Sequence, residues 1–416
     1  MEASIYRLKY RDVLTICVLA LLSLGVIMVQ SASMRVGDLP VNLDATRIVN
    51  SQTSWKWTPA GLAQLKMSVL AFAIYLVIGR MDYTRLASRD FFRNPTVLLI
   101  ATAGVLCLAV LVPGLGKEIN GARRWLRFIP IQPSELGKWS VVFFLCYCIS
   151  FRAFDLSKFG KGFMLMLLPV GLVTLLVVIQ DFGTAALIGC CIFLICMVGQ
   201  VRMKHLLGIS VPAIAIAYWF VRHKAYRWRR ITAFMDPYSA PQKEGYHMIQ
   251  SLLSFSTGGI WGRGLGNGIQ KLGYLPEDTT DFIFAVICEE LGLFGALLTI
   301  VFYVGIIFVA WQVIRRNRDA FGRIMAFAIA TMVGLQALIN IAVATVSVPT
   351  KGLSLPLVSA GGTGLVITCA ALGVLYSISR IQSPVLSTEP VRFGFKSASS
   401  SSEQIDLSSQ DLAGVL

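Results

Sequence analysis

The sequence predicts an all-α membrane protein with about ten transmembrane helices and a large extracytoplasmic loop between helices 7 and 8. Of its 416 residues, 56% are apolar and only 14% are charged, whereas soluble domains carry roughly a quarter charged residues. The apolar residues form long blocks, and about 20 such residues cross a bilayer as a helix. Basic residues gather in every second segment between the blocks, as expected for a chain that crosses a membrane repeatedly.

We expect spans at 13–31, 61–79, 96–115, 138–151, 162–179, 183–200, 205–221, 282–313, 322–347 and 362–379. The block at 138–151 is short and is expected to extend into its flanks. The block at 282–313 is long enough to include a cytoplasmic extension. The first block lacks a convincing signal-peptidase site, so we interpret it as a span.

The alternation of charge orients the chain. The basic segments place both termini in the cytoplasm and the protein in the inner membrane. Residues 1–12 form a cytoplasmic segment, 13–382 the membrane domain, and 383–416 a Ser-rich cytoplasmic tail that is expected to be disordered. All nine cysteines fall inside apolar blocks, which argues against disulfides and against a zinc site.

Several basic residues break this rule because they lie in predicted outer loops. They are Arg123, Arg124 and Arg127 in the loop 117–138, Arg222, Lys224, Arg227, Arg229 and Arg230 in the large loop 222–281, and Lys351 in a short loop. One interpretation pairs them with lipid headgroups or with local acids. The other is a phosphate-bearing substrate, since the fork of an arginine matches phosphate oxygens. Within the large loop, residues 249–255 are apolar enough for a short helix lying on the membrane.

Asp281 is the strongest candidate for chemistry because it stands at the outer mouth of the span 282–313. Thr279 or Thr280 is predicted to cap that helix start, where the helix dipole favours an ionised carboxylate. Asp281 is therefore either a base or a second cap. Glu289 and Glu290 lie two turns deeper, and the helical angle points Glu290 away from Asp281.

Two further stretches carry polar residues at predicted helix starts. In Gln132-Pro-Ser-Glu-Leu-Gly-Lys138, the proline suits a helix start, and Glu135 and Lys138 are spaced to pair. The Gly-rich stretch from 348 to 364 precedes the last span, and its backbone N–H groups are able to face an anion.

Together these stretches resemble the SEDS family (shape, elongation, division and sporulation), which includes RodA and FtsW. The matching motifs are Asn120-Gly-Ala-Arg-Arg-Trp-Leu, Gln132-Pro-Ser-Glu-Leu-x-Lys, Gln180-Asp-x-Gly-Thr, Tyr246-His-x-x-Gln-Ser, Leu275-Pro-Glu-x-x-Thr-Asp-Phe-Ile-Phe with Glu289-Glu-Leu-Gly, and Pro349-Thr-Lys-Gly-Leu-x-Leu-Pro with Ser359-x-Gly-Gly. They follow in family order across residues 10–380. The Pro-Thr-Lys-Gly form looks more like FtsW than RodA. Ala360 departs from the family's usual tyrosine.

The resemblance implies an inverting peptidoglycan glycosyltransferase of cell division that polymerises lipid II at the outer face of the membrane. The family's essential loop aspartate matches Asp281, which is therefore the expected catalytic residue. Substrate-binding candidates are Glu118, Asn120, Arg123, Arg124, Gln132, Ser134, Lys138, Arg229, Arg230, Gln250, Lys351 and Ser359. Expected partners are a class B penicillin-binding protein, other division proteins, lipid II and membrane lipids, with no nucleic acid. The sequence identifies no cofactor with certainty; a divalent cation (Mg²⁺ or Mn²⁺) is the candidate, and Glu118 could hold it.

Two rival functions also follow from the residues. A lipid II flippase would use Glu289, Glu290 and Asp181 inside the membrane, where polar residues mark transport paths. A non-catalytic division scaffold would follow if Ala360 reflected decay of the motif. The placement of the unusual charges at the outer mouth favours the enzyme.

Overall fold

The computed structural model describes residues 9–34 and 57–381, except 89, 120–121, 128–130, 224, 244 and 273. Within these residues every predicted span coincides with a helix. The bounds are α1 Tyr10–Ala32, α3 Pro59–Arg80, α4 Pro95–Leu111, α5 Pro133–Ser150, α6 Leu165–Gln180, α7 Phe182–Val198, α8 Met203–Arg222, α11 Ile283–Arg316, α12 Ala320–Ala344 and α13 Thr363–Arg380.

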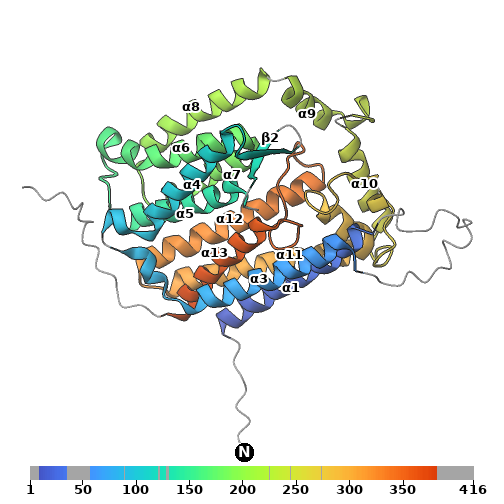
Figure 1. The fold of residues 1–416 in the computed structure, drawn as a ribbon, viewed down its shortest axis with the longest axis horizontal. Coiled ribbons are helices and arrows are strands. Elements are labelled where there is room, and N and C mark those ends of the chain that lie inside the picture. Colours follow the sequence, from blue (N-terminus) through green and yellow to red (C-terminus); the bar gives the residue numbers. More distant parts are fainter. Residues whose placement is uncertain are drawn as a thin grey trace, which may run out of the picture.

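The spanning helices lie side by side in one bundle (Figure 1). α3 packs along α13, α1 along α11, and α4 along α5, while α12 contacts α5, α7, α11 and α13. Seven helical segments of the described chain are long and apolar enough to cross a membrane. α4 and α7 have 17 residues each, at the lower limit of about 17–25 for a spanning helix. The prediction of an all-α membrane protein is confirmed.

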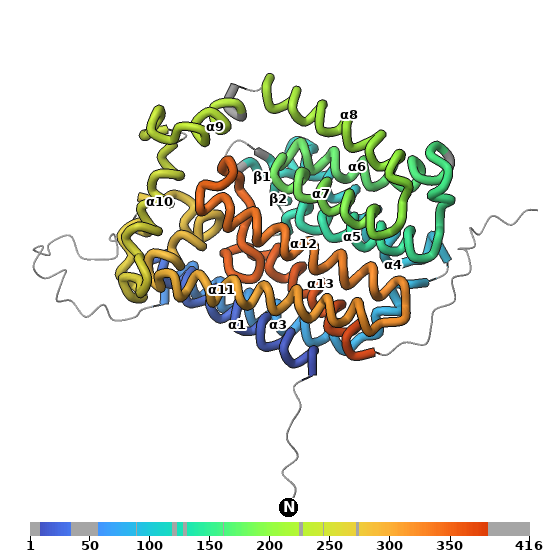
Figure 2. The backbone as a smooth tube through the Cα atoms, turned by 180° about the vertical axis from the view of Figure 1, so that it is seen from behind, coloured from blue at the N-terminus to red at the C-terminus, as the bar shows by residue number. Residues whose placement is uncertain are grey.

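α5 is the central helix and α8 the most peripheral one. Sixteen of the 18 residues of α5 are buried, and the helix begins at Pro133, before the predicted span. A helix that is buried on all sides belongs to the core. α8, by contrast, buries only Leu206 and runs along the outside of the bundle in the view from behind (Figure 2).

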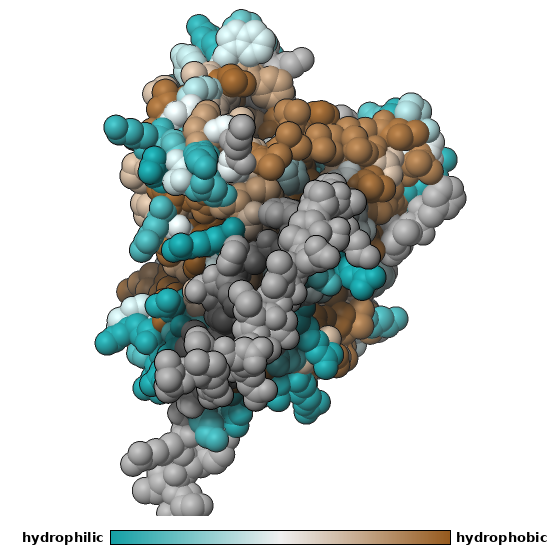
Figure 3. All heavy atoms as spheres, turned by 90° about the vertical axis from the view of Figure 1, so that its left-hand side faces the viewer, coloured by the Kyte–Doolittle hydropathy of each residue, from teal (hydrophilic) through white to brown (hydrophobic). Residues whose placement is uncertain are grey.

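The helix ends predicted to be cytoplasmic meet at one end of the bundle. Arg316 Nη2 donates to Tyr10 Oη at 2.8 Å, and Arg380 Nη2 donates to the Arg80 carbonyl at 2.7 Å. Hydrophilic side chains gather on this end, with hydrophobic ones along the flanks (Figure 3). The first and last described helices thus share an end, as an even number of crossings requires. Of the predicted cytoplasmic segments 1–12 and 383–416, residues 1–8 and the whole of 383–416 lie outside the described residues.

The opposite end carries the predicted outer loops, which are more structured than expected. The loop 117–138 contains an antiparallel hairpin of β1 (Gly116–Ile119) and β2 (Ala122–Leu126), which the sequence analysis did not predict. The loop 222–281 contains α9 (Ala225–Met235) and α10 (Tyr246–Gly258). The helix expected at 249–255 is therefore confirmed and is longer; its position on a membrane stays a prediction.

The short one-turn elements are η2 Tyr83–Ala87, η3 Phe91–Arg93, η5 Pro237–Ser239 and η6 Gln270–Leu272, and a π-helical turn, η4 Phe159–Met164, leads into α6.

The single span predicted at 282–313 is wrong in one respect, because α11 is broken at Gly292. This residue has φ 64°, outside the helical region, and glycine adopts such a conformation without a Cβ penalty. The chain at 259–264 fills the break: Leu293 N–H donates to the Gly259 carbonyl at 3.0 Å, and Arg263 N–H to the Glu289 carbonyl at 3.0 Å. The outer half-helix 283–291 is thereby separated from the rest of α11.

Candidate functional site

Asp281 lies in the turn that leads into the outer half-helix of α11. The prediction that Thr279 or Thr280 caps this helix is wrong, because the cap position is Phe282 and no side chain caps it. The Thr280 hydroxyl instead donates to Glu277 Oε2 at 2.9 Å. Asp281 therefore stands one residue outside the helix, and its side chain is partly buried.

The backbone of this turn is fixed by the loop that precedes α13. Ser359 Oγ donates to the Thr280 carbonyl at 2.6 Å, and Ala360 N–H donates to the Thr279 carbonyl at 2.9 Å. The contact at Ala360 uses the main chain, so it does not require the tyrosine that is usual at this position in the family.

Gly352 brings the same loop against the carboxylate of Asp281. A Cβ added to Gly352 would lie 2.9 Å from Asp281 Oδ2, which is closer than real Cβ contacts allow. The absence of a side chain at 352 is therefore what lets the loop at 351–353 lie against the carboxylate of Asp281.

The environment raises the pKa of Asp281 to about 7. Burial is the main cause, and the carboxylates of Glu277 and Asp181 act in the same direction, while Arg124 and Arg230 oppose it. The sequence analysis expected the helix start to favour the charged form. Burial outweighs that effect here, because desolvation disfavours the ionised carboxylate.

Asp181 joins the site from the turn between α6 and α7. Its Oδ1 accepts from Gly183 N–H at 3.0 Å, and its Oδ2 accepts from the Thr184 hydroxyl at 2.6 Å, so it caps α7. The flippase interpretation placed Asp181 inside the membrane. The structure instead places it at the end of the bundle that carries the predicted outer loops, close enough to Asp281 to influence its pKa.

The hairpin separates the two predicted phosphate-binding arginines. Successive side chains of a strand point to opposite faces. Arg123 forms an ion pair with Glu118 at 3.8 Å, and both side chains are substantially exposed. Arg124 Nε donates to the Gln180 carbonyl at 3.1 Å and lies near enough to lower the pKa of Asp281. Arg124 is thus the member of the pair that faces the site.

Two further cations lie beside this group. Lys351 Nζ is 5.5 Å from the ring centroid of Phe182, the residue after Asp181. Arg230, on α9, donates from Nη1 to the Thr350 carbonyl at 3.5 Å. The structure therefore brings Arg124, Arg230 and Lys351 together with Asp281, although they come from four separate segments.

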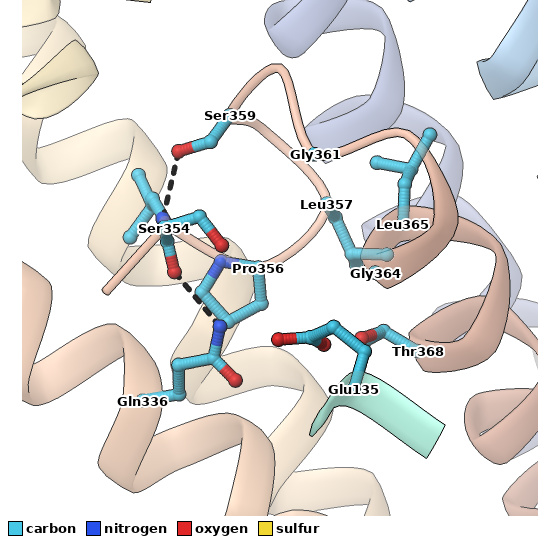
Figure 4. Close-up of a pocket in the computed structure, with 11 residues that line it drawn as sticks. Glu135, Gln336, Ser354, Pro356, Leu357, Ser359, Gly361, Gly364, Leu365 and Thr368 are labelled. Carbon is cyan, nitrogen blue, oxygen red and sulfur yellow. Dashed lines mark hydrogen bonds between the residues drawn. The ribbon is translucent and has the colours of Figure 1, made fainter. Parts of the chain in front are cut away.

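Lys138 and Glu135 pair as predicted, at 2.8 Å, but within the bundle. Lys138 is 1% exposed and also donates to Gln336 Oε1 at 2.8 Å. Gln336 Nε2 in turn donates to the Ser354 carbonyl at 2.8 Å. In Figure 4, Glu135 points into a small cavity bounded by Pro356, Gly364 and Thr368. Lys138 therefore does not contact Asp281 but supports, through Gln336, the loop that precedes α13.

The remaining predicted substrate-binding residues take supporting or peripheral positions. Ser134 is buried and accepts from Gln132 Nε2 at 3.1 Å, while Gln132 N–H donates to the Thr363 hydroxyl at 3.3 Å. Gln250 is partly buried on α10, and Arg229 is exposed on α9. Ser359 is buried behind Asp281, and Asn120 lies outside the described residues.

His247, in the Tyr246-His motif of α10, packs against the Asp281 turn. Its ring stacks on Phe282 with centroids 5.8 Å apart and an interplanar angle of 7°. Burial lowers the pKa of His247, with Arg230 acting in the same direction and Glu277 opposing it. α10 thus packs an uncharged ring against the segment that carries Asp281.

Glu289 and Glu290 form a separate cluster, as the helical angle predicted. Glu289 Oε1 accepts from Ile269 N–H at 2.7 Å. Glu290 pairs with Lys271 at 2.8 Å and accepts from the Ser31 hydroxyl and from Gly266 N–H. These contacts tie the chain at 266–271 to the outer half-helix and to α1.

The sequence analysis missed Glu277, Lys271, Gln336 and Asn340. The two amides of α12 are spaced four residues apart and so share a helix face, which is a signal that the sequence carries. Glu277 stands in the Leu275-Pro-Glu motif but was not singled out, and Lys271 lay in the large loop without a distinguishing pattern.

The chain is similar to known proteins over most of its length. Residues 11–383 match the family model described as "Cell cycle protein", which groups FtsW, RodA and SpoVE. The "Probable peptidoglycan glycosyltransferase FtsW" of Geobacter metallireducens is 34% identical over 378 residues, or 89% of this chain and 95% of the relative. The protein of that name from Coxiella burnetii is 34% identical over 380 residues, or 89% and 96%.

Solved structures share the fold. One chain, from a peptidoglycan synthase complex studied for the structural coordination of polymerization and crosslinking, superposes with a TM-score of 0.65 at 25% identity, over 88% of this chain and 96% of that one. The rod shape determining protein RodA of Thermus thermophilus superposes with a TM-score of 0.57 at 24% identity, over 88% and 95%.

Proposed function

Because the chain belongs to the FtsW, RodA and SpoVE family of cell cycle proteins, we propose that it is a peptidoglycan glycosyltransferase of cell division, which polymerises lipid II at the outer face of the cytoplasmic membrane. One observation carries the proposal. A single carboxylate with its pKa raised to about 7, Asp281, lies among the cations Arg124, Arg230 and Lys351. The relatives named peptidoglycan glycosyltransferase FtsW support it.

The proposed reaction needs one base and a group of cations. A sugar hydroxyl of the acceptor attacks the anomeric carbon of the donor, and its proton passes to the carboxylate of Asp281. The bond from that carbon to the lipid pyrophosphate breaks, and the leaving group departs with the electron pair. Arg124, Arg230 and Lys351 stabilise its charge, so no general acid is needed. A single displacement inverts the anomeric configuration.

The pKa of Asp281 suits this role. A general base works best when its pKa lies near the operating pH, because it must be ionised and still take up a proton. An exposed aspartate, at about 4, would be a much weaker base.

The proposed reaction routes no step through a metal ion. Within the described residues, no group of three or more His, Cys, Asp or Glu side chains is arranged to hold one. Glu118, the candidate from the sequence, is paired with Arg123. Mg²⁺ often binds through one or two carboxylates and substrate phosphates, so a cation that arrives with lipid II remains compatible with Asp181 and Glu277.

We also propose that the chain works with a class B penicillin-binding protein that crosslinks the strands. The solved complex with the same fold couples polymerization and crosslinking, which supports this partner. The flippase alternative loses support, because Glu289 and Glu290 are occupied by the chain at 266–271.

The decisive experiment is glycan synthesis from lipid II by the purified protein with its partner, read as chain length on a gel. Asp281→Asn is expected to reduce the rate by about 10²–10⁴-fold, the usual contribution of a general base, while lipid II binding persists. Asp278→Asn is the matched control, since Asp278 belongs to the same turn but lines a groove with Ser33 and Thr58. Glycan synthesis by Asp281→Asn at the parent rate would refute the assignment.

The orientation has its own test. In a cysteine-light variant, a cysteine at Ala240 is expected to react with an impermeant reagent from the periplasmic side, and one at Ser88 is not. The reverse pattern would place the site on the cytoplasmic face and would exclude polymerisation at the outer surface.

A further inference from the structure

Asn340, on α12, is the buried residue that joins the two halves of the site. Its Nδ2 donates to the Asp281 carbonyl at 2.8 Å and to the Leu353 carbonyl at 2.7 Å. The side chain is 1% exposed. One amide nitrogen therefore links the turn that carries Asp281 directly to the loop segment that carries Lys351 and Gly352.

This separation matters because the contact between the two segments is tight. Gly352 lies against Asp281 Oδ2 so closely that a Cβ at 352 would come within 2.9 Å. Leu353, whose carbonyl Asn340 holds, is the next residue. A displacement of either segment would change the distance between the carboxylate and the Lys351 ammonium.

The neighbouring contacts hold the loop but do not replace this one. Gln336, one turn earlier on α12, donates to the Ser354 carbonyl at 2.8 Å. Ser359 donates to the Thr280 carbonyl at 2.6 Å. Of these three residues, only Asn340 contacts the Asp281 residue itself and the loop at once.

We propose that Asn340 is a positioning residue for the glycosyltransferase reaction: it fixes the Asp281 backbone against the 351–353 segment and so places the base beside the cation group. The inference rests on the proposed function. Asn340 is too buried to meet a substrate, and it acts through the residues that it holds.

The pH dependence of the reaction separates positioning from simple stabilisation. The charged groups that act on Asp281 are Glu277 in its own turn, Asp181 between α6 and α7, Arg124 on β2 and Arg230 on α9. Lys351 precedes Gly352, which lies against the carboxylate. Burial is the largest cause of the raised pKa. A turn released from Asn340 would admit water to the carboxylate, and the pH midpoint of the rate would fall below about 7.

Asn94 offers a matched control at the other end of the bundle. It is a buried asparagine whose Nδ2 also donates to two carbonyls, those of Leu86 at 3.1 Å and Ser88 at 2.9 Å. Asn94→Ala removes a pair of Nδ2 hydrogen bonds of the same kind far from Asp281, and it also removes the cap that Asn94 Oδ1 provides to Thr96 at the start of α4. It is expected to lower the melting temperature while the pH midpoint and kcat stay unchanged.

The experiment measures kcat, KM for lipid II and the pH profile of full-length Asn340→Ala and Asn94→Ala with the partner present. Asn340→Ala is expected to lower kcat by about 10–100-fold, since misplacement by about 1 Å costs up to about 100-fold. KM should change little, and the pH midpoint should fall. Asn340→Ser, which keeps one donor, should lie between Asn340→Ala and the parent.

Parent-like kcat and pH midpoint in a folded Asn340→Ala would overturn the inference. If Asn340→Ala does not accumulate, Asn340→Ser decides by the same readouts. Failure of both to accumulate, while Asn94→Ala folds, would assign Asn340 a purely structural role. An active Asp281→Asn would instead refute the proposed function, whereas an inactive Asp281→Asn beside a parent-like Asn340→Ala would refute only the role of Asn340.

Discussion

Asp281→Asn is expected to stabilise the protein at neutral and alkaline pH while it abolishes activity. The folded environment raises the pKa of Asp281 from its ordinary 3.8 to about 7. The unfolded chain therefore ionises first as the pH rises. The stability that this group contributes is fully present below pH 3.8 and is lost progressively until about pH 7.

The magnitude follows from the shift. About three pKa units at about 1.4 kcal/mol each give an upper bound of about 4 kcal/mol above pH 7, and about 2 kcal/mol of this falls between pH 5 and 7. Asparagine has the same shape and does not titrate. The stability of the variant relative to the parent should thus increase with pH and level off above about 7.

The assay is the melting temperature of the detergent-purified protein from pH 5 to 8.5, compared between the parent, Asp281→Asn and Asp278→Asn. The difference between Asp281→Asn and the parent should grow with pH, and the same carboxylate should give a polymerisation rate that rises up to about pH 7. A difference in melting temperature that is flat, or that shrinks as the pH rises, would refute the claim that burial destabilises the ionised carboxylate.

Three further outcomes are expected. Arg124→Lys should lose most of the polymerisation rate, since lysine lacks the planar fork that binds phosphate. Arg123→Lys, on the exposed face of the hairpin, should lose little. Equal losses in the two variants would contradict the separation of the two arginines. Gly352→Ala should reduce kcat by about 100-fold because its Cβ displaces the carboxylate of the base, and parent-like kcat would count against that contact. Glu290→Gln should lower the melting temperature, since a buried lysine left unpaired costs roughly 3–5 kcal/mol. Adding Lys271→Met to the same chain should restore part of that loss. If the two substitutions lower the melting temperature additively, the result would argue against the ion pair.

The helices were predictable because the bilayer leaves few solutions. Backbone N–H and C=O groups in the hydrocarbon layer must find their hydrogen-bond partners within the same segment, so a long apolar block is a helix. The break in α11 was not predictable by the same reasoning. Gly292 interrupts an apolar run that reads as continuous, and the groups that satisfy the freed backbone come from Gly259 and Arg263, about 30 residues away along the chain.

The candidate site was predictable in its parts but not in its assembly. Asp281, Arg124 and Lys351 each belonged to a distinct motif, and the alternation of charge placed all three outside. Their proximity depends on tertiary packing. The sequence analysis also treated Arg123 and Arg124 as equivalent, because a five-residue strand is too short to show its alternation.

The role of Asn340 could not be predicted from the sequence either. A single amide in an apolar span is usually a contact between helices, and nothing in the sequence indicates which carbonyls it binds. The two carbonyls belong to Asp281 and Leu353, which are 59 and 13 residues away from it.

Glu290, on the outer half-helix, and Asp281, in the turn before it, show how the structure assigns one carboxylate to stability and the other to chemistry. Glu290 is fully buried, yet Lys271, the Ser31 hydroxyl and the Gly266 N–H satisfy its oxygens, so it stays a structural anchor. In the described part of the chain no donor hydrogen-bonds to the carboxylate of Asp281, and Asn340 holds only its backbone. An unsatisfied carboxylate in a partly buried site gains from protonation, which is what a base must do when it takes a proton from the attacking hydroxyl.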